Sequence, residues 1–403
     1  MKFNKLSQLF LVSTIGLLVA TLLTSCEITT IDYVFVACSS GSGTGSPGEI
    51  QTYDADSETG TLRIGQPAVP SGGSSPVAMA VTSDYLNLYV ANQGNSSVAH
   101  FAIAGNGVLT AKDSITTDTT PVSVAVNAAG TYLYVVSGTE SATLTAYSLS
   151  SGTIGAAVAQ INLSVPGFGE DVIIPTGVFA LASNNAVYVS AYDQSAYNPG
   201  GATPSLANPG WVFGFAIGSG GALTPAPGSP YKAGVKPSAL VADPTSRFVY
   251  VTDFASNELI GYSIQAGYNL NFLINGPFKT ANEPQAVVID PRGIYIYVAN
   301  ALSNTVSGYV INLGTGTPST IATTTGNGTN QTDTQPVAII VDASLGRFVY
   351  TANQLGDSVS GFEMSPNTGS LAPTQVSPYP VGDQPMAIAS VPHGSHSIQV
   401  VTP

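Results

Sequence analysis

One phrase recurs along the chain, and its spacing restricts the folds that the chain can adopt. Each copy opens with Pro-x-Ala or a close variant, passes through an apolar run and a turn, and continues into a Tyr-Val run. Seven starts can be recognised, spaced 45 to 62 residues apart, at Pro76, Pro121, Pro175, Pro237, Pro284, Pro336 and Pro385. A period of roughly 40–50 residues with four short strands per copy is typical of β-propellers. The sequence therefore predicts an all-β fold, a seven-bladed β-propeller with four-stranded antiparallel blades.

The clearest copy starts at Pro284 and reads PQAVVIDPRGIYIYVANALSNTVSGYVI. We name the four strands of a blade A to D in chain order: A follows the proline, B is the Tyr-Val run, C carries Gly-Tyr or Gly-Phe, and D follows a glycine-rich turn. Because successive strands are antiparallel, the B–C and D–A connections share one face of the ring, and the A–B and C–D turns share the other. Analogy with other propellers favours ligand entry at the B–C/D–A face.

The two ends of the repeat region complement each other. The first strands expected are B-like (31–37), C-like (49–55) and D-like (61–69), with no A strand before them. The last A strand, 385–390, has no C or D strand after it. Joining the two ends makes the seventh blade and leaves few free sheet edges. Residues 397–401 form a second B-like run, whose place in that blade is left open.

Composition limits the possible partners. Charged residues make up 8% of the chain and the formal net charge is −13, with no cluster of Lys or Arg beyond the N-terminus. Binding to nucleic acid requires clustered cations that neutralise phosphates, so the sequence argues against it. The same charge argues against electrostatic docking on anionic lipid. The two cysteines, Cys26 and Cys38, make no disulfide framework, and Cys38 is expected to be a buried thiol.

The N-terminus reads as a secretory leader. Lys2 and Lys5 precede a 15-residue apolar run at 9–23, which is short for a bilayer span. The following Leu-Thr-Ser-Cys26 resembles the bacterial lipobox. That resemblance implies a signal peptide at 1–25, lipid on Cys26, a tether at 26–30 and a propeller at 31–403. An uncleaved anchor helix or secretion without lipid are the alternatives. We expect a lipid-anchored protein of the bacterial cell envelope, with the outer membrane or cell surface favoured because Glu27, not Asp, follows Cys26.

The repeat resembles a known family. The segments YVAN, YVTD and YTAN, followed by runs such as SVSGF, look like the YVTN-type repeats of the lactonase-family seven-bladed propellers, which are related to one class of 6-phosphogluconolactonase. The resemblance covers about residues 31–403 and implies the propeller fold. Because these motifs build the scaffold of each blade, the lactonase activity of the family is only an expectation for this chain.

Long insertions single out one neighbourhood of the B–C/D–A face. Residues 195–210 expand the fourth B–C loop of the chain, in the copy that starts at Pro175, and 166–174 form the D–A loop before it. Together they are expected to gather the ligand-binding candidates Glu170, Asp171, Tyr192, Asp193, Tyr197 and Trp211. Trp211 is the only Trp of the chain, so its indole either stacks on a sugar ring or packs the insertion onto the blade.

Three charged residues are candidates for lactone chemistry. Opening a lactone requires a general base for water and a cation or hydrogen-bond donor for the developing oxyanion. Glu283, Asp383 and Lys236 fall just before the proline of an A strand, on the B–C/D–A face. Enzymes of the family that the repeat resembles are understood to place Arg and His around the central pocket as well. Here Arg247, Arg292 and Arg347 fall in A–B turns on the other face.

Other chemistries find little support. The run from Asp54 to Gly60 resembles a calcium loop, but it occupies a C–D hairpin. No zinc-ligand set and no G-x-S-x-G elbow is present, and we expect no metal and no cofactor. Two functions remain. The first is a membrane-tethered extracytoplasmic module that binds or scaffolds a small molecule, glycan or protein. The alternative is a lactonase-like hydrolase, so whether the protein is an enzyme stays open.

Overall fold

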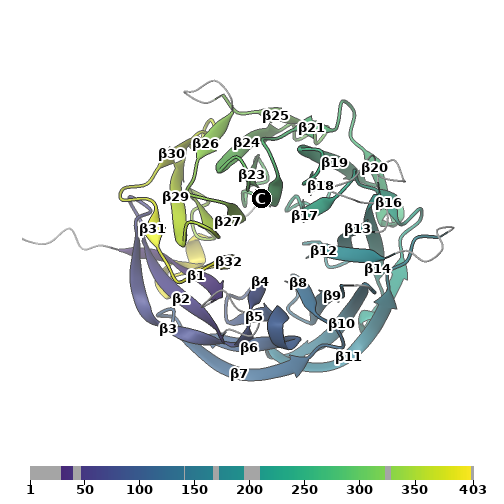
Figure 1. The fold of residues 1–403 in the computed structure, drawn as a ribbon, viewed down its shortest axis with the longest axis horizontal. Helices are drawn as coiled ribbons and strands as arrows, with labels where there is room; N and C mark the ends of the chain where they lie inside the picture. Colours follow the sequence, from purple (N-terminus) through teal and green to yellow (C-terminus); the bar gives the residue numbers. More distant parts are fainter. Residues whose placement is uncertain are drawn as a thin grey trace, which may run out of the picture.

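The computed structural model shows a ring of seven antiparallel sheets around a central axis (Figure 1). The structure describes residues 29–39, 47–139, 141–166, 172–194, 209–322 and 328–400. Within these residues the helical elements are short 3-10 helices: η1 (Gln93–Asn95), η2 (Ser219–Gly221), η3 (Ala266–Tyr268) and η4 (Gly394–Gln399). In the same residues, no helix is both long and apolar enough to cross a bilayer. The predicted seven-bladed β-propeller is confirmed.

Three blades have a continuous outer strand. The first complete blade contains β4 (Pro76–Val81), β5 (Asn87–Asn92), β6 (Ser97–Ile103) and β7 (Leu109–Thr116). The next contains β8 (Pro121–Val126), β9 (Tyr132–Ser137), β10 (Thr143–Ser150) and β11 (Thr153–Asn162). The closing blade contains β1 (Thr30–Ser39), β2 (Pro47–Asp56), β3 (Leu62–Ser74) and β32 (Pro385–Pro392).

In the other four blades the outer D strand is split into two short pieces. One blade has β12 (Ile173–Ala180), β13 (Ala186–Asp193), β14 (Gly210–Ile217), β15 (Leu223–Pro225) and β16 (Tyr231–Lys232). The next has β17 (Pro237–Ala242), β18 (Phe248–Asp253), β19 (Glu258–Ile264), β20 (Leu270–Phe272) and β21 (Phe278–Lys279). Then follow β22 (Pro284–Ile289), β23 (Tyr295–Asn300), β24 (Thr305–Ile311), β25 (Pro318–Thr320) and β26 (Thr329–Gln331). The last has β27 (Pro336–Val341), β28 (Phe348–Asn353), β29 (Ser358–Met364), β30 (Leu371–Pro373) and β31 (Tyr379–Pro380).

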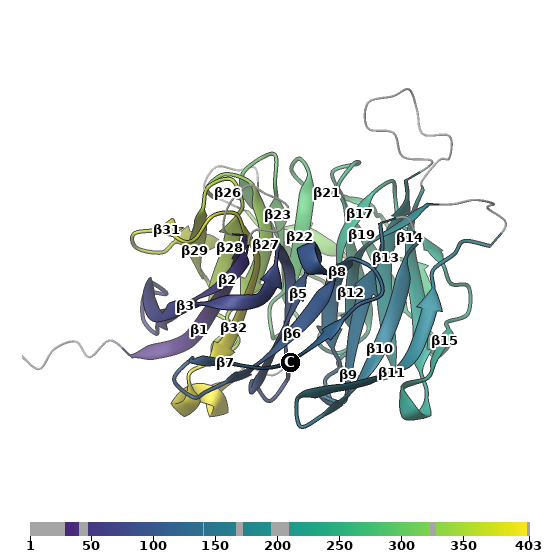
Figure 2. The same cartoon turned by 60° about the horizontal axis from the view of Figure 1, so that its bottom comes forward.

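The ends of the chain close the ring as predicted. The closing sheet has the order β3-β2-β1-β32, and β1 pairs antiparallel with β32 through partners such as Val34 with Ser390. The B position is therefore already occupied by β1. The B-like run at 397–401 does not form a second strand, because Gly394–Gln399 is the helix η4. In Figure 2 this helix, drawn in yellow, lies at the end of the ring opposite to β21 and β31.

The burial of each strand follows its place in the blade. Strands such as β5, β18 and β28 are buried at every position because both of their faces pack on neighbouring blades. The outer strand β7 is instead mostly exposed after Leu109, where only Asp113 and Ile115 are partly buried. The A strands, such as β4 and β22, are mostly half-buried along the axis. The A strands therefore form the wall around the ring axis.

The tyrosine of the Tyr-Val run links neighbouring blades. In five blades its phenol donates a hydrogen bond of 2.5–2.8 Å to a carbonyl oxygen in the C–D turn of the following blade. The pairs are Tyr89 to Gly152, Tyr188 to Tyr268, Tyr250 to Gly316, Tyr297 to Gly369, and Tyr350 to Gly60. Buried phenols need such partners. The recurring tyrosine is thus a contact between blades rather than part of a binding site.

A second set of tyrosines runs in the opposite direction around the ring. Tyr262 of β19 donates to the carbonyl of Lys232 in the D strand of the preceding blade, at 2.5 Å. Tyr309 donates in the same way to Lys279, and Tyr53 to Pro380. The two sets join both the inner and outer strands of neighbouring blades, which explains why aromatic residues recur in the B and C strands.

The acidic residues after the A strands stabilise turns. The Oδ1 atom of Asp290 accepts the backbone N–H groups of Ile294 and Tyr295, both at 2.7 Å. Asp243 and Asp342 accept equivalent amides in their own blades. In the Asp54–Gly60 segment, Asp56 likewise accepts the amides of Glu58 and Thr59, so this segment is a capped hairpin turn.

Candidate functional site

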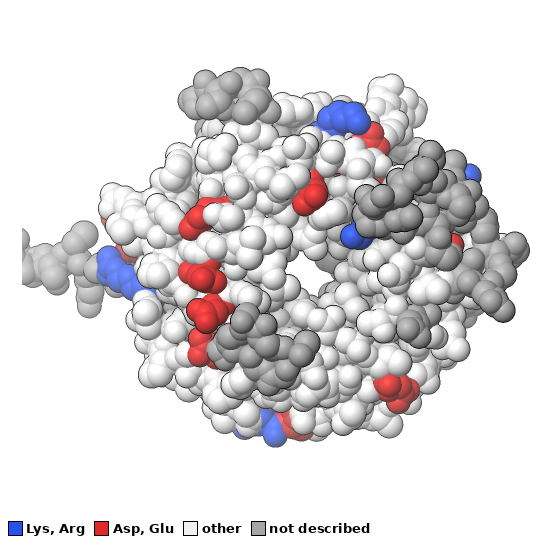
Figure 3. Space-filling view, viewed as in Figure 1, with Lys and Arg blue, Asp and Glu red and all other residues white. Residues whose placement is uncertain are grey.

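A cavity of about 660 Å³ lies on the ring axis and opens at the B–C/D–A face. Its walls come from the first residues of the A strands, and its mouth comes from D–A residues such as Lys236 and Glu283 and from B–C residues such as Phe254 and Gln354. Figure 3 shows the hollow at the centre of the ring, surrounded by mostly uncharged surface. Its volume is within the range of roughly 300–1,000 Å³ that is usual for small-molecule sites.

In six blades the residue before the A-strand proline is held in the same way, and three of these residues, Lys236, Glu283 and Gln335, line the cavity. Its carbonyl oxygen accepts the backbone amide of the last residue of the B strand or of the residue directly after it. This bond measures 2.8–3.2 Å and joins Ser39 to Gln384, Gln93 to Ser75, Gly138 to Thr120, Phe254 to Lys236, Ala301 to Glu283, and Gln354 to Gln335. The frame is the same in these six blades while the side chain differs, so these positions can vary in chemistry without altering the fold.

Lys236 has its backbone fixed from two sides. The buried carboxylate of Asp253, at the end of β18, accepts the amide of Lys236 at 2.9 Å and that of Val235 at 2.8 Å. The amide of Phe254 binds the Lys236 carbonyl. Gly234 precedes this segment with φ +72°, and a Cβ there would lie 2.0 Å from Asp253 Oδ2. Asp253 takes the place of the repeat's terminal Asn, and here it positions the lysine.

Glu283 is held in a similar way, by a side chain of the B–C turn. Its amide donates to Asn257 Oδ1 at 2.7 Å, and its carbonyl accepts the amide of Ala301. Glu283 adopts φ +55°, a left-handed conformation that is uncommon for a non-glycine residue. Gln335 and Gln384 adopt the same conformation before their prolines. The left-handed backbone is therefore a property of the repeat and not evidence of catalysis.

The ammonium group of Lys236 lies against aromatic rings. Its Nζ atom is 4.6 Å from the ring centre of Phe254 and 5.4 Å from that of Tyr192, within the range of cation–π contacts. Burial lowers the pKa of Lys236, and the negative charge of Glu283 partly opposes this. The two charged groups thus influence each other across the mouth. Tyr192, predicted as a ligand-binding residue, contacts the lysine that the sequence assigned to catalysis.

The hydroxyl groups of the wall have partners within the protein. Ser238 Oγ donates to the carbonyl of Pro284 in the next blade at 2.6 Å and lies 2.8 Å from Thr252 Oγ1. Thr176 Oγ1 lies 2.8 Å from the hydroxyl of Ser190. These groups are hydrogen-bonded rather than poised as nucleophiles. In the described residues, the one other nucleophile of interest, Cys38, is buried away from the cavity, and burial raises the pKa of its thiol to about 12.

The structure brings some predicted site residues together and separates others. Lys236 and Glu283 both line the cavity, whereas Asp383 is exposed and does not. Asp193 ends β13 and is 2% exposed. Four predicted residues lie outside the described residues: Cys26, Glu170, Asp171 and Tyr197.

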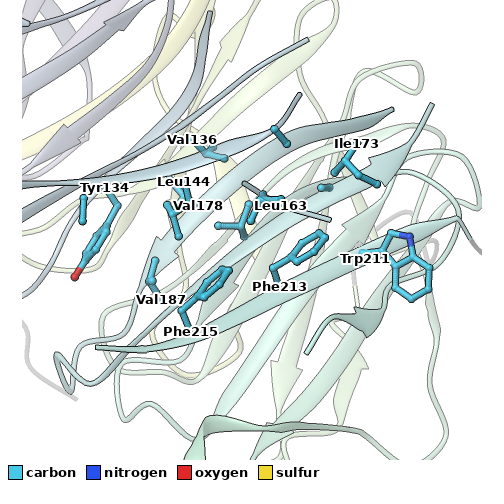
Figure 4. Packing of buried hydrophobic residues seen from close by; sticks show 14 of the residues in the cluster. Tyr134, Val136, Leu144, Leu163, Ile173, Val178, Val187, Trp211, Phe213 and Phe215 are labelled. Atoms are coloured by element: carbon cyan, nitrogen blue, oxygen red, sulfur yellow. The ribbon is translucent and has the colours of Figure 1, made fainter. Parts of the chain in front are cut away.

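Trp211 lies within a hydrophobic cluster. It is 7% exposed and belongs to the same cluster as Ile173, Val178 and Phe213, and Figure 4 shows it at one end of this group. Its strand β14 pairs on one side with β13 and on the other with β16. This burial favours the packing role over stacking on a sugar.

Several lining residues were missed by sequence reasoning. They are the amides and hydroxyls Gln93, Ser123, Thr176, Ser238, Gln285, Gln335 and Gln354. Their positions in the repeat could have identified them. Some follow an A-strand proline within three residues, and the others stand directly before such a proline or directly after the last residue of a B strand. None of them is charged, so the requirement of lactone chemistry for a general base and a cation does not point to them.

The arginines are engaged in A–B turns, as predicted. Arg292 Nε lies 2.7 Å from Asp290 Oδ2, and Arg347 Nη2 lies 2.6 Å from Glu363 Oε1. Arg247 donates to the carbonyl of Leu313. His100 is buried in β6, between Asp113 and Asn87. Among the described residues that line the cavity there is thus no Arg or His, and Lys236 and Glu283 are its charged groups. In the described part of the chain, no cluster of His, Cys, Asp or Glu is arranged to hold a metal.

The fold and this cavity define a class of protein: a seven-bladed β-propeller with a pocket on the ring axis that is lined by residues of its repeats. The chain belongs to the lactonase family of seven-bladed propellers. Its sequence matches the family described as "Lactonase, 7-bladed beta-propeller" over residues 38–169 and 239–396. A comparison with curated proteins finds no match.

Solved structures share the architecture at low sequence identity. A periplasmic gluconolactonase of Pseudomonas aeruginosa has 16% identity and a TM-score of 0.72, over 93% of this chain and 100% of that one. A 6-phosphogluconolactonase candidate from Bacteroides fragilis has 18% identity and a TM-score of 0.69, over 91% of this chain and 99% of that one. Identities this low show a shared fold and leave the activity of this chain to be argued from its own residues.

Proposed function

We propose that the protein hydrolyses lactones at the mouth of the axial cavity. The observation that carries this proposal is the pair of Glu283 and Lys236, the charged groups of the described lining, held on adjacent D–A connections by Asn257 and Asp253. Membership of the lactonase family supports it. This membership favours a lactonase-like hydrolase over a scaffolding module.

In the proposed reaction the Glu283 carboxylate accepts a proton from water as the water oxygen attacks the lactone carbonyl carbon. The negative charge that develops on the carbonyl oxygen is stabilised by the Lys236 ammonium group, whose desolvated site strengthens the interaction. Collapse of the tetrahedral intermediate breaks the ring C–O bond. The proton held by Glu283 passes to the leaving alkoxide, and the product is a hydroxy acid.

The test compares the wild-type protein with Glu283→Gln and Lys236→Met in glucono-δ-lactone hydrolysis, corrected for the uncatalysed rate. Loss of a general base typically lowers the rate by roughly 100-fold or more. The matched control is Glu258→Gln, because Glu258 pairs with Lys279 outside this cavity. Turnover that survives Glu283→Gln contradicts the assignment of the base.

A binding module is the competing function, and the mostly uncharged lining of the cavity favours it. Its partner would be a small molecule, a glycan or a segment of another protein. If the wild-type protein binds glucono-δ-lactone in calorimetry but shows no turnover above the uncatalysed rate, the binding module holds and the hydrolase proposal fails.

We also propose that the protein is anchored in the bacterial cell envelope by lipid on Cys26. The leader and the lipobox-like sequence support this, and β1 begins at Thr30, four residues after Cys26. A lipid there would hold the closing blade near the bilayer. Metabolic palmitate labelling should be lost in Cys26→Ala and retained in Cys38→Ala. Labelling that survives Cys26→Ala refutes the anchor.

A further inference from the structure

The wall just inside the mouth is divided into two chemically different halves. The first residue after the A-strand proline lines the cavity in all seven blades: Val77, Val122, Thr176, Ser238, Gln285, Val337 and Met386. Each is partly exposed. Neighbouring A strands contact one another in chain order, and β32 contacts β4, so the order of these residues around the axis is their order in the sequence.

This order places like residues side by side. Thr176, Ser238 and Gln285 come from consecutive blades and form a polar arc. Val337, Met386, Val77 and Val122 come from the four remaining consecutive blades and form an apolar arc. Deeper in the cavity the lining is apolar through residues such as Met79, Val124, Val287, Ile339 and Ile388. At the level of the first residue after the proline, the wall therefore presents hydrogen-bonding side chains on one side only.

The charged pair belongs to the polar arc. Lys236 directly precedes the strand that carries Ser238, and Glu283 directly precedes the strand that carries Gln285. The neutral amides of Gln93, Gln335 and Gln354 stand above the apolar arc at the outer lip. A reacting carbonyl placed between Lys236 and Glu283 thus has its far side turned toward valine and methionine side chains.

The charge of the site disfavours a phosphorylated ligand. One ammonium group faces one carboxylate in the described lining, and a phosphate dianion would meet no second cation and no guanidinium fork. The formal net charge of −13 adds long-range repulsion for an anion that approaches the molecule. The same features are compatible with an uncharged ligand.

We infer that the substrate is an uncharged lactone with an alkyl arm, whose carbonyl is held at the polar arc while the arm lies across Val337, Met386 and Val77. This inference rests on the proposed hydrolysis for the reaction, but the ligand class follows from the two arcs. The cavity of about 660 Å³ has room for both a ring and an arm.

The experiment compares three δ-lactones: δ-decanolactone with its pentyl arm, glucono-δ-lactone, and 6-phosphoglucono-δ-lactone. We expect kcat/KM for δ-decanolactone to exceed that for glucono-δ-lactone about tenfold, with the phosphorylated lactone slowest. Met386→Gln, which extends the polar arc, should reduce this preference roughly tenfold, whereas Gln285→Met, which extends the apolar arc, should increase it. A preference for the phosphorylated lactone, or a preference that neither variant changes, overturns the inference.

Binding separates this inference from the proposed reaction. Calorimetric titration of Glu283→Gln with the same three lactones measures ligand preference without turnover. If no lactone is hydrolysed but δ-decanolactone still binds best and Met386→Gln removes that advantage, the hydrolysis fails and the ligand class stands. If lactones are hydrolysed but δ-decanolactone neither binds nor reacts, the hydrolysis stands and the ligand class is overturned. Circular dichroism of each variant confirms the fold.

Discussion

The phenol of Tyr350 donates a 2.8 Å hydrogen bond to the carbonyl oxygen of Gly60, a residue 290 positions away in the sequence. This bond crosses the seam between the last blade and the closing blade. It repeats, at the seam, the contact that the equivalent tyrosines make between other blades. The ring is thus closed by the same side-chain chemistry that joins its internal blades, in addition to the pairing of β1 with β32.

Removing this phenol should weaken the seam. Tyr350→Phe leaves the buried Gly60 carbonyl without its donor, which should lower the free energy of unfolding by about 1–2 kcal/mol. The control is Tyr134→Phe, because the Tyr134 hydroxyl is buried and has no partner among the described residues. That change should cost nothing. Urea denaturation measures both, and equal losses in the two variants would show that the hydrogen bond is not the cause.

A buried acid at the same seam should make stability depend on pH. Asp32 is fully buried, accepts a 2.7 Å hydrogen bond from Ser344 Oγ, and lies next to Asp342 of the preceding blade. Burial and the charge of Asp342 raise the pKa of Asp32 well above its ordinary value. A raised pKa in the folded state means that the stabilisation is complete at low pH and is lost as pH rises through the folded pKa.

Asp32→Asn should therefore raise the melting temperature at pH 8, since it retains a neutral hydrogen-bonding side chain. The gain in stability should shrink as the pH falls toward 4, where the folded protein also holds Asp32 in its neutral form. Calorimetry across this range, with the exposed Asp118→Asn as reference, measures it. A variant that is less stable at pH 8 would show that Asp32 is ionised in the folded protein.

The B–C turn should control the placement of Glu283. Asn257 has φ +58° and binds the Glu283 amide, so Asn257→Gly removes the acceptor while keeping the left-handed backbone accessible. We expect kcat for lactone hydrolysis to fall about tenfold with a smaller change in KM, because the base is displaced while the rest of the cavity is intact.

Two variants control for this effect. Asn257→Asp retains an acceptor oxygen and should restore most of the kcat. Asn304 makes the same contact with the amide of Gln335, so Asn304→Gly tests the loss of an equivalent turn away from the charged pair. If Asn304→Gly lowers kcat as much as Asn257→Gly, the effect is on the fold and not on Glu283.

Truncation should show where ring closure ends. A chain that stops at Gln384 lacks β32 and leaves β1 with an unpaired edge, so it should lose its cooperative unfolding transition. A chain that stops at Pro392 retains β32 and lacks only η4 and the residues after it, and should unfold cooperatively. Differential scanning calorimetry distinguishes the two, and a cooperative transition in the shorter chain would contradict closure by β32.

The sequence by itself determined the number of blades, the antiparallel strand order and the closure by both ends. Each of these depends on a repeat that can be read locally, because a proline marks each A strand and the Tyr-Val run marks each B strand. The placement of Lys236 and Glu283 at the mouth followed from the same rule. Asp383 lies one residue before Gln384, which holds the left-handed position before Pro385, and it does not line the cavity.

Only the tertiary structure decided which contacts form between the repeats and which surface they line together. The burial of Trp211, the helical conformation of Gly394–Gln399 and the contact of Lys236 with Phe254 depend on neighbours that no single repeat contains. The two arcs of the cavity arise for the same reason. Seven residues that are 45 to 62 positions apart become neighbours only when the ring closes, and their polarity then becomes a property of one surface.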